Sequence, residues 1–225
     1  MMIPLREFSA RVAELERQKR LLAKIGVLPH ASTPVELLYD NSTDEELRLA
    51  FRDYYERNWQ RIFGDINKRI NSCGIDEEAK ATLGEALQAH ENGHYRAVSR
   101  MLFPEIERVV RVELRENAIG NISMAKLMSD TADDLSTTDL EPRGYFSLAL
   151  LERLTDHLYV RVMTEDSRKK MEGDLVPNRH AAIHGLVVYN SYWNSLNAIF
   201  MTDFAFQIVG SVKRASSREL PVSNR

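Results

Sequence analysis

The amino-acid sequence predicts an all-α fold, a helical bundle, from three observations. Apolar residues recur at steps of three, four and seven along most of the chain, which is the spacing of one helical face. Most of these stretches start or stop at residues typical of helix ends. No period-two run of β-branched residues and no internal repeat is present. We therefore expect helices packed against helices, without a β-sheet.

Composition places the chain among ordinary globular proteins. Its 225 residues are 44% hydrophobic and 28% charged, which is enough for one domain with a sizeable core. The net charge of −3 gives no global basic field, so contact with RNA would need a local patch or a surface formed by paired copies. A single cysteine, Cys73, cannot form an internal disulfide, which is typical of reducing compartments.

The sequence contains no expected membrane segment. The N-terminus lacks the apolar run of a signal peptide. The most apolar stretch, residues 198–209, includes Thr202, Asp203 and Gln207 and is too short to span a bilayer. We expect a cytoplasmic protein.

The first 75 residues predict an N-terminal helical extension. Apolar residues at helical spacing over 5–25 end at Gly26. Residues 27–42 contain Pro29, Pro34 and Asn41 and predict a connector with one helical turn. The hydroxyls and acids of residues 42–46 predict the start of a long helix that ends near Gly74.

Residues 76–212 predict the main helical domain. Asp76 begins a helix that ends near His90, and a second covers 94–117, where Pro104 should kink it or divide it. The remaining pattern predicts a short helix at 121–128, a loop at 130–142, and helices at 145–162 and 192–209. Residues 213–225 form a basic tail that we expect to be disordered.

One stretch of this domain concentrates reactive side chains. Asn178, Arg179, His180 and His184 fall within seven residues, just before the most apolar segment. Pro177 suits the first turn of a helix, and Asp174 suits a cap or a turn. Arg179 should therefore lie in a first helical turn, where the backbone favours an anion.

The spacing of these side chains sets what they can do together. His180 and His184 are four residues apart and should share one helical face. Arg179 and His184 lie about 140° apart around a helix of 3.6 residues per turn, so they meet only through the reach of arginine or a cleft at the helix start. A phosphate there would meet a permanent cation and a group that titrates near neutral pH.

The segment Asn178-Arg179-His180-Ala181-Ala182-Ile183-His184-Gly185 resembles the signature of HEPN domains. These α-helical modules carry Arg-x4–6-His with a polar residue directly after the arginine, which is His180 here. Residues 92–111 are similar to the long helix pair that precedes the motif in many bacterial HEPN-type proteins. The resemblance covers about residues 76–210 and implies a HEPN-like core behind the N-terminal extension.

The resemblance implies a metal-independent endoribonuclease of the kind found among toxins and phage-defence effectors. It implies no cofactor, RNA as the substrate, a homodimer in which two motifs face one cleft, and an inhibitor or antitoxin protein as a further partner. His184 would act as base or acid in attack by the RNA 2′-hydroxyl. Arg179 would grip the phosphate, and His180 would orient the phosphate or His184.

Further residues are candidates for substrate binding. Glu107, Arg111 and Arg115 occur at four-residue steps and form either a wall of the cleft or an intrahelical charge ladder. Asn178 belongs to the motif itself. Tyr189, like Tyr192 and Trp193, would stack on RNA bases or belong to the core.

Other interpretations of the motif remain open. In a purely structural one, Arg179 pairs with a carboxylate, His180 caps the helix and His184 is a core histidine, so that the module is catalytically inactive and binds RNA, a nucleotide or a protein. In another, His180 and His184 bind a metal with His157, Asp156 or Glu152, although no glutamate follows His180 as in zinc proteases. Leu186 stands where one toxin branch carries a modified tyrosine, which argues against that mode of control.

Overall fold

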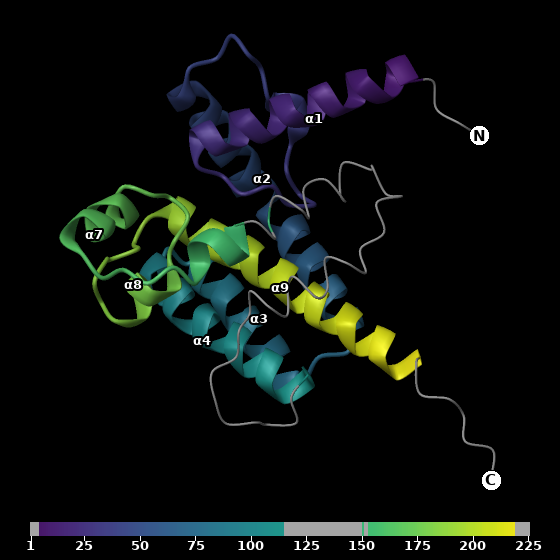
Figure 1. Cartoon of the computed structure of the whole chain (residues 1–225), viewed down its shortest axis with the longest axis vertical. Helices are drawn as coiled ribbons and strands as arrows, with labels where there is room; N and C mark the ends of the chain where they lie inside the picture. Colours follow the sequence, from purple (N-terminus) through teal and green to yellow (C-terminus); the bar gives the residue numbers. More distant parts are fainter. Residues whose placement is uncertain (1–4, 115–149, 151–152, 219–225) are drawn as a thin grey trace.

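The computed structural model of the chain is all-helical, as the sequence predicts (Figure 1). It describes residues 5–114, 150 and 153–218, and no β-strand occurs among them. The elements in chain order are α1 (Leu5–Ile25), the 3₁₀ turn η1 (Val35–Leu37), α2 (Asp44–Ser72), α3 (Glu77–Glu91), α4 (Tyr95–Leu114), the π-helical turn η2 (Leu154–Leu158), α7 (Glu165–Glu172), α8 (Arg179–Ile183) and α9 (Tyr192–Arg218).

Helix α9 is the central element of the bundle. It runs through the middle of the molecule and contacts α2, α3 and α4 (Figure 1). By length and composition alone, residues 192–214 would pass as a membrane-spanning helix, and this stretch is longer than the 198–209 considered from the sequence. Most of the stretch is nevertheless buried inside the protein, which is how the core helix of a bundle is placed.

The N-terminal helices share one hydrophobic core with the rest of the chain. Buried side chains from α1, such as Leu22, and from α2, such as Phe51, belong to the same cluster as Leu102 of α4 and Phe200 of α9. Residues 1–75 thus supply part of the core on which the later helices pack. The domain boundary drawn at residue 75 stays a prediction.

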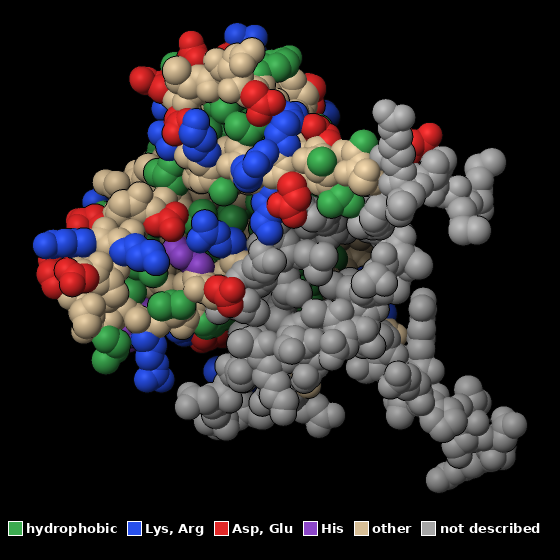
Figure 2. All heavy atoms as spheres, turned by 45° about the horizontal axis from the view of Figure 1, so that its top comes forward, with side chains coloured by type: hydrophobic (Ala, Val, Ile, Leu, Met, Phe, Trp, Pro, Cys, Tyr) green, Lys and Arg blue, Asp and Glu red, His purple; other side chains and the backbone are tan. Residues whose placement is uncertain are grey.

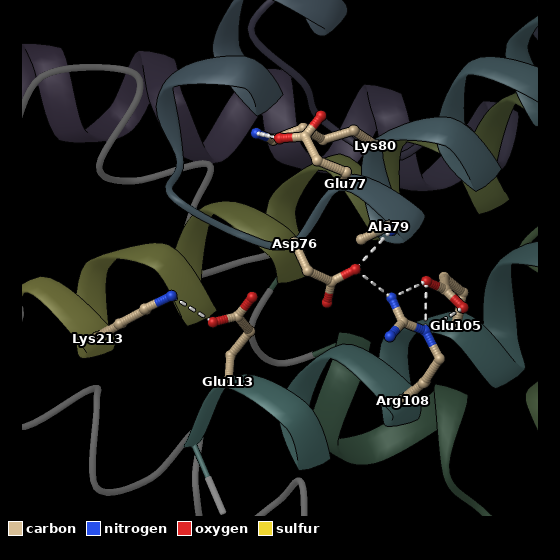
Figure 3. Close-up of polar contacts among 8 residues, drawn as sticks. All are labelled: Asp76, Glu77, Ala79, Lys80, Glu105, Arg108, Glu113 and Lys213. Atoms are coloured by element: carbon tan, nitrogen blue, oxygen red, sulfur yellow. Dashed lines mark hydrogen bonds and ion pairs between the residues drawn. The ribbon is translucent and has the colours of Figure 1, made fainter. Parts of the chain in front are cut away.

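Helix starts follow the capping signals in the sequence. Thr43 accepts from the Glu46 N–H (3.2 Å) and donates its own N–H to the Glu46 carboxylate (2.7 Å), which is a complete capping box. Asp76 caps α3 through the Ala79 N–H (3.0 Å). Arg108 on α4 reaches the same Asp76 oxygen (2.7 Å) and also holds Glu105, so this charged group joins the start of α3 to α4 (Figure 3).

Two helices differ from the sequence-based expectation. Helix α4 runs continuously through Pro104, so the chain is not divided there. A proline removes one backbone hydrogen bond, and the buried stripe of Val98, Leu102, Ile106 and Val109 keeps the two turns packed on the core. Helix α7 was not expected, although Thr164 and Ser167 form a capping box at its start.

The expected disordered tail is wrong for residues 213–218, which continue α9. Lys213 pairs with Glu113 of α4 and donates to the Gly74 carbonyl oxygen (2.9 Å), so the last turns of α9 are held on both sides (Figure 3). The predicted short helix at 121–128, the loop at 130–142 and residues 145–149 and 151–152 of the helix at 145–162 lie outside the described residues. The described remainder of that helix ends at Leu158, so its expected end at residue 162 was wrong.

A buried charged group ties the connector after α1 to α2 and α9. His30 Nε2 donates to Asp203 Oδ2 (2.8 Å), and Arg69 Nη2 donates to the same oxygen (2.9 Å). The His30 ring stacks on Phe200, with centroids 4.1 Å apart, and its Nδ1 accepts from the Ser32 hydroxyl (2.7 Å). Asp203 is fully buried, so it depends on these donors for its charge.

Acid should weaken this group. Burial lowers the pKa of His30 from its usual 6.5. Burial opposes the charge of Asp203, but His30 and Arg69 outweigh it and hold the Asp203 pKa below 3.8. As the pH falls below about 6.5, His30 binds a proton more readily in the unfolded chain than in the folded one, and below about 3.8 the same holds for Asp203. The free energy of unfolding therefore decreases on acidification.

Asp203→Asn should lower the free energy of unfolding by about 3 kcal/mol at pH 7.5, because Arg69 and His30 lose a buried charged partner. Urea unfolding followed by far-ultraviolet circular dichroism measures this. The matched control is Asp53→Asn, which removes an exposed ion pair with Arg57 (2.8 Å) and should cost about 0.5 kcal/mol or less. Equal effects of the two substitutions would contradict the role given to Asp203.

Gly210→Ala should destabilise the fold by about 1–3 kcal/mol, because the new Cβ would meet the backbone carbonyl of Cys73 where α9 crosses the end of α2. Gly64→Ala is the control in α2: nothing lies within 4 Å of its Cβ position, and alanine should stabilise the helix by about 0.5–1 kcal/mol. Thermal unfolding of both variants gives the comparison. A stabilised Gly210→Ala protein would refute the close approach of α9 and α2.

Candidate functional site

The motif begins a five-residue helix, α8, whose cap is Asn178. The Asn178 Oδ1 accepts from the Ala181 N–H (2.9 Å), and its Nδ2 donates to the carbonyl oxygens of His157 (2.6 Å) and Val160 (3.0 Å). The helix therefore starts at Arg179, two residues later than a proline at the first helical position would suggest. Asn178 is fully buried, so its expected role in substrate binding is wrong: its amide is consumed in holding the backbone.

Arg179 projects from the first turn of α8 onto α4. Its Nη2 donates to Glu107 Oε2 (2.6 Å), and its guanidinium carbon lies 5.7 Å from the centre of the Tyr159 ring. About a quarter of the Arg179 side chain is exposed. Glu107 thus contacts the motif directly and holds the guanidinium partly exposed.

Two other groups beside this ion pair carry buried polar atoms. Arg111 lies one turn beyond Glu107 on α4, and the Nε atoms of Arg111 and Arg179 are buried with no hydrogen-bond partner among the described residues. The Tyr159 hydroxyl is likewise buried with no hydrogen-bond partner among the described residues. Burial, and then the charge of Glu107, raises the pKa of Tyr159, so this hydroxyl stays protonated. Arg115 lies outside the described residues.

The two histidines of the motif lie side by side at the surface. Their ring centroids are 4.6 Å apart. The Val162 N–H points at His180 Nδ1 (3.4 Å), which places the His180 proton on Nε2. Burial, followed by the nearby charges of His184, Arg161 and Arg179, lowers the pKa of His180 below 6.5, so its imidazole is neutral at neutral pH.

His184 is exposed and ends the helix. It occupies the C-cap position of α8, and Gly185 follows with a φ of +67°, a conformation that suits glycine. Its ring is therefore accessible to solvent and is not a core histidine. The structural interpretation fits Arg179, which pairs with a carboxylate, but does not fit His184.

The aromatic residues after the motif belong to the core. Tyr189 and Tyr192 are 3% and 7% exposed, so of the two alternatives, stacking on RNA bases and a place in the core, Tyr189 takes the place in the core. The N–H groups of Leu186 and Val187 return to the Ala181 carbonyl oxygen (2.9 and 3.3 Å), and this turn directs the following chain inward. The spacing of Tyr189 in the sequence does not show which way this turn directs the chain.

The metal-site interpretation finds no support in the described part of the chain. No group of three or more His, Cys, Asp or Glu side chains there is placed to hold a metal ion. His157 is buried, and its Nε2 donates to the Val176 carbonyl oxygen (2.8 Å), so it braces the segment before the motif. Glu152 lies outside the described residues.

Exposed apolar side chains occur in the two chain segments that carry or contact the histidine pair. Five large ones lie in two segments that meet at His180, and we call them the apolar rim: Val160, Met163, Ile183, Leu186 and Val188. Met163 is 75% exposed. Sequence reasoning missed this rim, because only the shortness of α8 and the turn after it leave these side chains without a core to enter. Clustered apolar surface of this kind marks an interaction site.

Comparisons with protein-family models, curated proteins and solved structures yielded no match. The resemblance to HEPN domains therefore rests on the motif and on the helices that carry it. An all-helical fold is shared by many unrelated bundles, so the fold alone does not indicate a function.

Proposed function

We propose that this chain is a metal-independent HEPN-type endoribonuclease that works as a homodimer in the cytoplasm, within a bacterial toxin or phage-defence system. The observation that carries the proposal is the surface arrangement of Arg179, His180 and His184 on one short helix. It brings together a permanent cation, a neutral imidazole and an exposed imidazole, which are the groups that phosphodiester cleavage requires.

In the proposed reaction the RNA 2′-oxygen attacks the adjacent phosphorus. One exposed His184 takes the 2′-hydroxyl proton, the new O–P bond forms, and the bond from phosphorus to the 5′-oxygen breaks. The His184 of the second copy protonates the leaving 5′-oxygen. The products are a 2′,3′-cyclic phosphate and a free 5′-hydroxyl, and no metal or redox partner is needed to balance the step.

Arg179 and His180 would stabilise the phosphorane. Glu107 engages Nη2 of Arg179 and holds the guanidinium in place, which leaves its Nη1 edge for a phosphate oxygen. His180 would donate from Nε2 to the phosphate or to His184, since its lowered pKa keeps it neutral. Glu107 is thus a positioning residue in this proposal.

The apolar rim supports the homodimer. Two copies that bury this rim against each other would bring their motifs close together, because the rim residues belong to the segment that carries His184 and to the segment that contacts His180. Pairing would also concentrate the arginines of two motifs, which gives a chain of net charge −3 a local cationic groove.

Purified protein should cleave single-stranded RNA in EDTA and leave 2′,3′-cyclic phosphate ends. Arg179→Ala should lower the rate about 10²–10³-fold, because it removes a charge partner of the transition state. His184→Ala should lower it about 10²–10⁴-fold, because it removes the general base and the general acid. The control is His94→Ala, an exposed histidine outside the motif, which should retain activity. Intact RNA at a large excess of wild-type dimer, or equal rates for all variants, would refute the nuclease.

Val188→Glu combined with Met163→Glu should abolish the dimer and lower RNA cleavage, because two charges would be buried in an apolar contact. Sedimentation velocity over a concentration series measures the association. Leu49→Glu is the matched control, since Leu49 is exposed on α2, away from the rim. Dimers that survive the double substitution would show that another surface pairs the copies.

The Arg179–Glu107 ion pair also favours a second candidate, a catalytically inactive HEPN-like module that binds RNA, a nucleotide or a partner protein. In that case the ion pair fixes α8 on α4 and has no role in chemistry. The same variants separate the two functions: the module would bind RNA or protein without cleaving, and His184→Ala would leave its affinity unchanged.

A further inference from the structure

A second polar site lies on the N-terminal side of the motif, in a pocket of about 550 Å³. One wall consists of the end of α1, the start of the connector and Arg48 of α2. The other consists of Arg153, Asp156, Lys170 of α7 and residues 173–176, which lead from α7 toward the motif. On this face, basic side chains gather at the boundary between the α1–α2 end and the α7 region (Figure 2). The volume is that of a small-molecule site.

The two walls are fixed to each other by buried asparagines of α9. Asn197 Nδ2 donates to the carbonyl oxygens of Gly26 (2.8 Å) and Leu175 (3.0 Å), while its Oδ1 accepts from the Leu28 N–H (2.9 Å). Asn194 Nδ2 also donates to the Leu175 carbonyl oxygen (3.0 Å). A side chain at Gly26 would press on Leu175, so glycine permits the walls to meet. The pocket is therefore preformed.

The lining is predominantly cationic. Five basic residues, namely Lys19, Lys24, Arg48, Arg153 and Lys170, face two acids, Asp156 and Asp174. Lys24 is also paired with Asp44 (2.8 Å), and Asp174 accepts from the Val176 N–H (2.9 Å). The pocket thus favours an anion.

The arrangement of the charges indicates an anion with more than one charged group. Lys19, Lys24 and Arg48 belong to the N-terminal wall, whereas Arg153 and Lys170 belong to the opposite wall. Two linked phosphates would engage both walls, whereas a single phosphate would engage one. Ala23, which is exposed, and Leu175, which is partly exposed, give the same pocket an apolar portion that a nucleobase could contact.

We propose that this pocket binds a small molecule with two or more phosphate groups and an apolar part, such as a nucleoside diphosphate. The proposal does not depend on the nuclease chemistry, because no residue of the Arg179–His184 motif lines the pocket. It does assign a task to the N-terminal helices, which form one wall. Leu175 and Val176 of the opposite wall lie directly before Pro177 and the cap Asn178, so an occupant would stabilise the segment that carries the motif.

The test is the melting temperature and isothermal titration of the full chain with ADP, pyrophosphate and inorganic phosphate. ADP should raise the melting temperature and bind at least tenfold more tightly than phosphate, with pyrophosphate between them. Lys170→Glu and Arg153→Glu should each weaken ADP binding at least tenfold, because each reverses a charge on one wall. Circular dichroism and unliganded melting temperatures confirm that the variants fold.

Lys169→Glu is the control, since it changes the net charge equally at the adjacent exposed residue, which does not line the pocket. It should keep ADP affinity within twofold of the wild type. Equal weakening by Lys169→Glu and Lys170→Glu would show a diffuse charge effect and overturn the proposal. The absence of binding by ADP and pyrophosphate at millimolar concentration would also overturn the proposal. Displacement of bound ADP by stoichiometric single-stranded RNA would overturn it too, because the pocket would then be part of an RNA-binding surface.

Discussion

The structure depends on polar side chains buried in an otherwise apolar helix. Helix α9 carries Asn194, Ser195, Asn197 and Asp203 inside the core, where each needs a hydrogen-bonding partner. The partners come from distant segments: His90 of α3 for Ser195 (2.8 Å), the connector after α1 for Asn197, and His30 with Arg69 for Asp203. Apolar burial favours the compact bundle, but these hydrogen bonds determine which loop lies against which turn of α9.

The hydrogen bonds to the buried polar side chains of α9 also determine where the candidate site lies. Because Asn197 and Asn194 hold Leu175, the chain before the motif is fixed at the surface of α9. The Asn178 side chain then donates to carbonyl oxygens of the segment 157–160 and accepts from an N–H of the first turn of α8. Arg179 is consequently directed to Glu107 on α4, and the histidines remain at the surface. A helix as short as α8 has little stability of its own, so this bracing sustains it.

The spacing of apolar residues and the capping residues predicted the helices well where a helix end depends on neighbouring residues alone. Gly26, Thr43 and Asp76 mark helix ends in the sequence and do so in the structure. The outcome at Pro104 could not be predicted, because packing on both sides of a proline decides whether a helix continues. The length of α9 beyond residue 212 was missed for a similar reason: Lys213 is polar in the sequence, but Glu113 and the Gly74 carbonyl oxygen give it partners.

By itself the sequence determined the all-α class, most helix boundaries and the grouping of Arg179, His180 and His184, since periodicity, caps and short spacing are properties of neighbouring residues. Only the tertiary structure decided that Asn178 and Tyr189 are interior, that Glu107 meets Arg179, and that five basic residues line one pocket. These outcomes depend on contacts between residues far apart in the chain. Which of these contacts form depends on which buried polar groups hydrogen-bond to each other, and the pattern of neighbouring residues does not determine that.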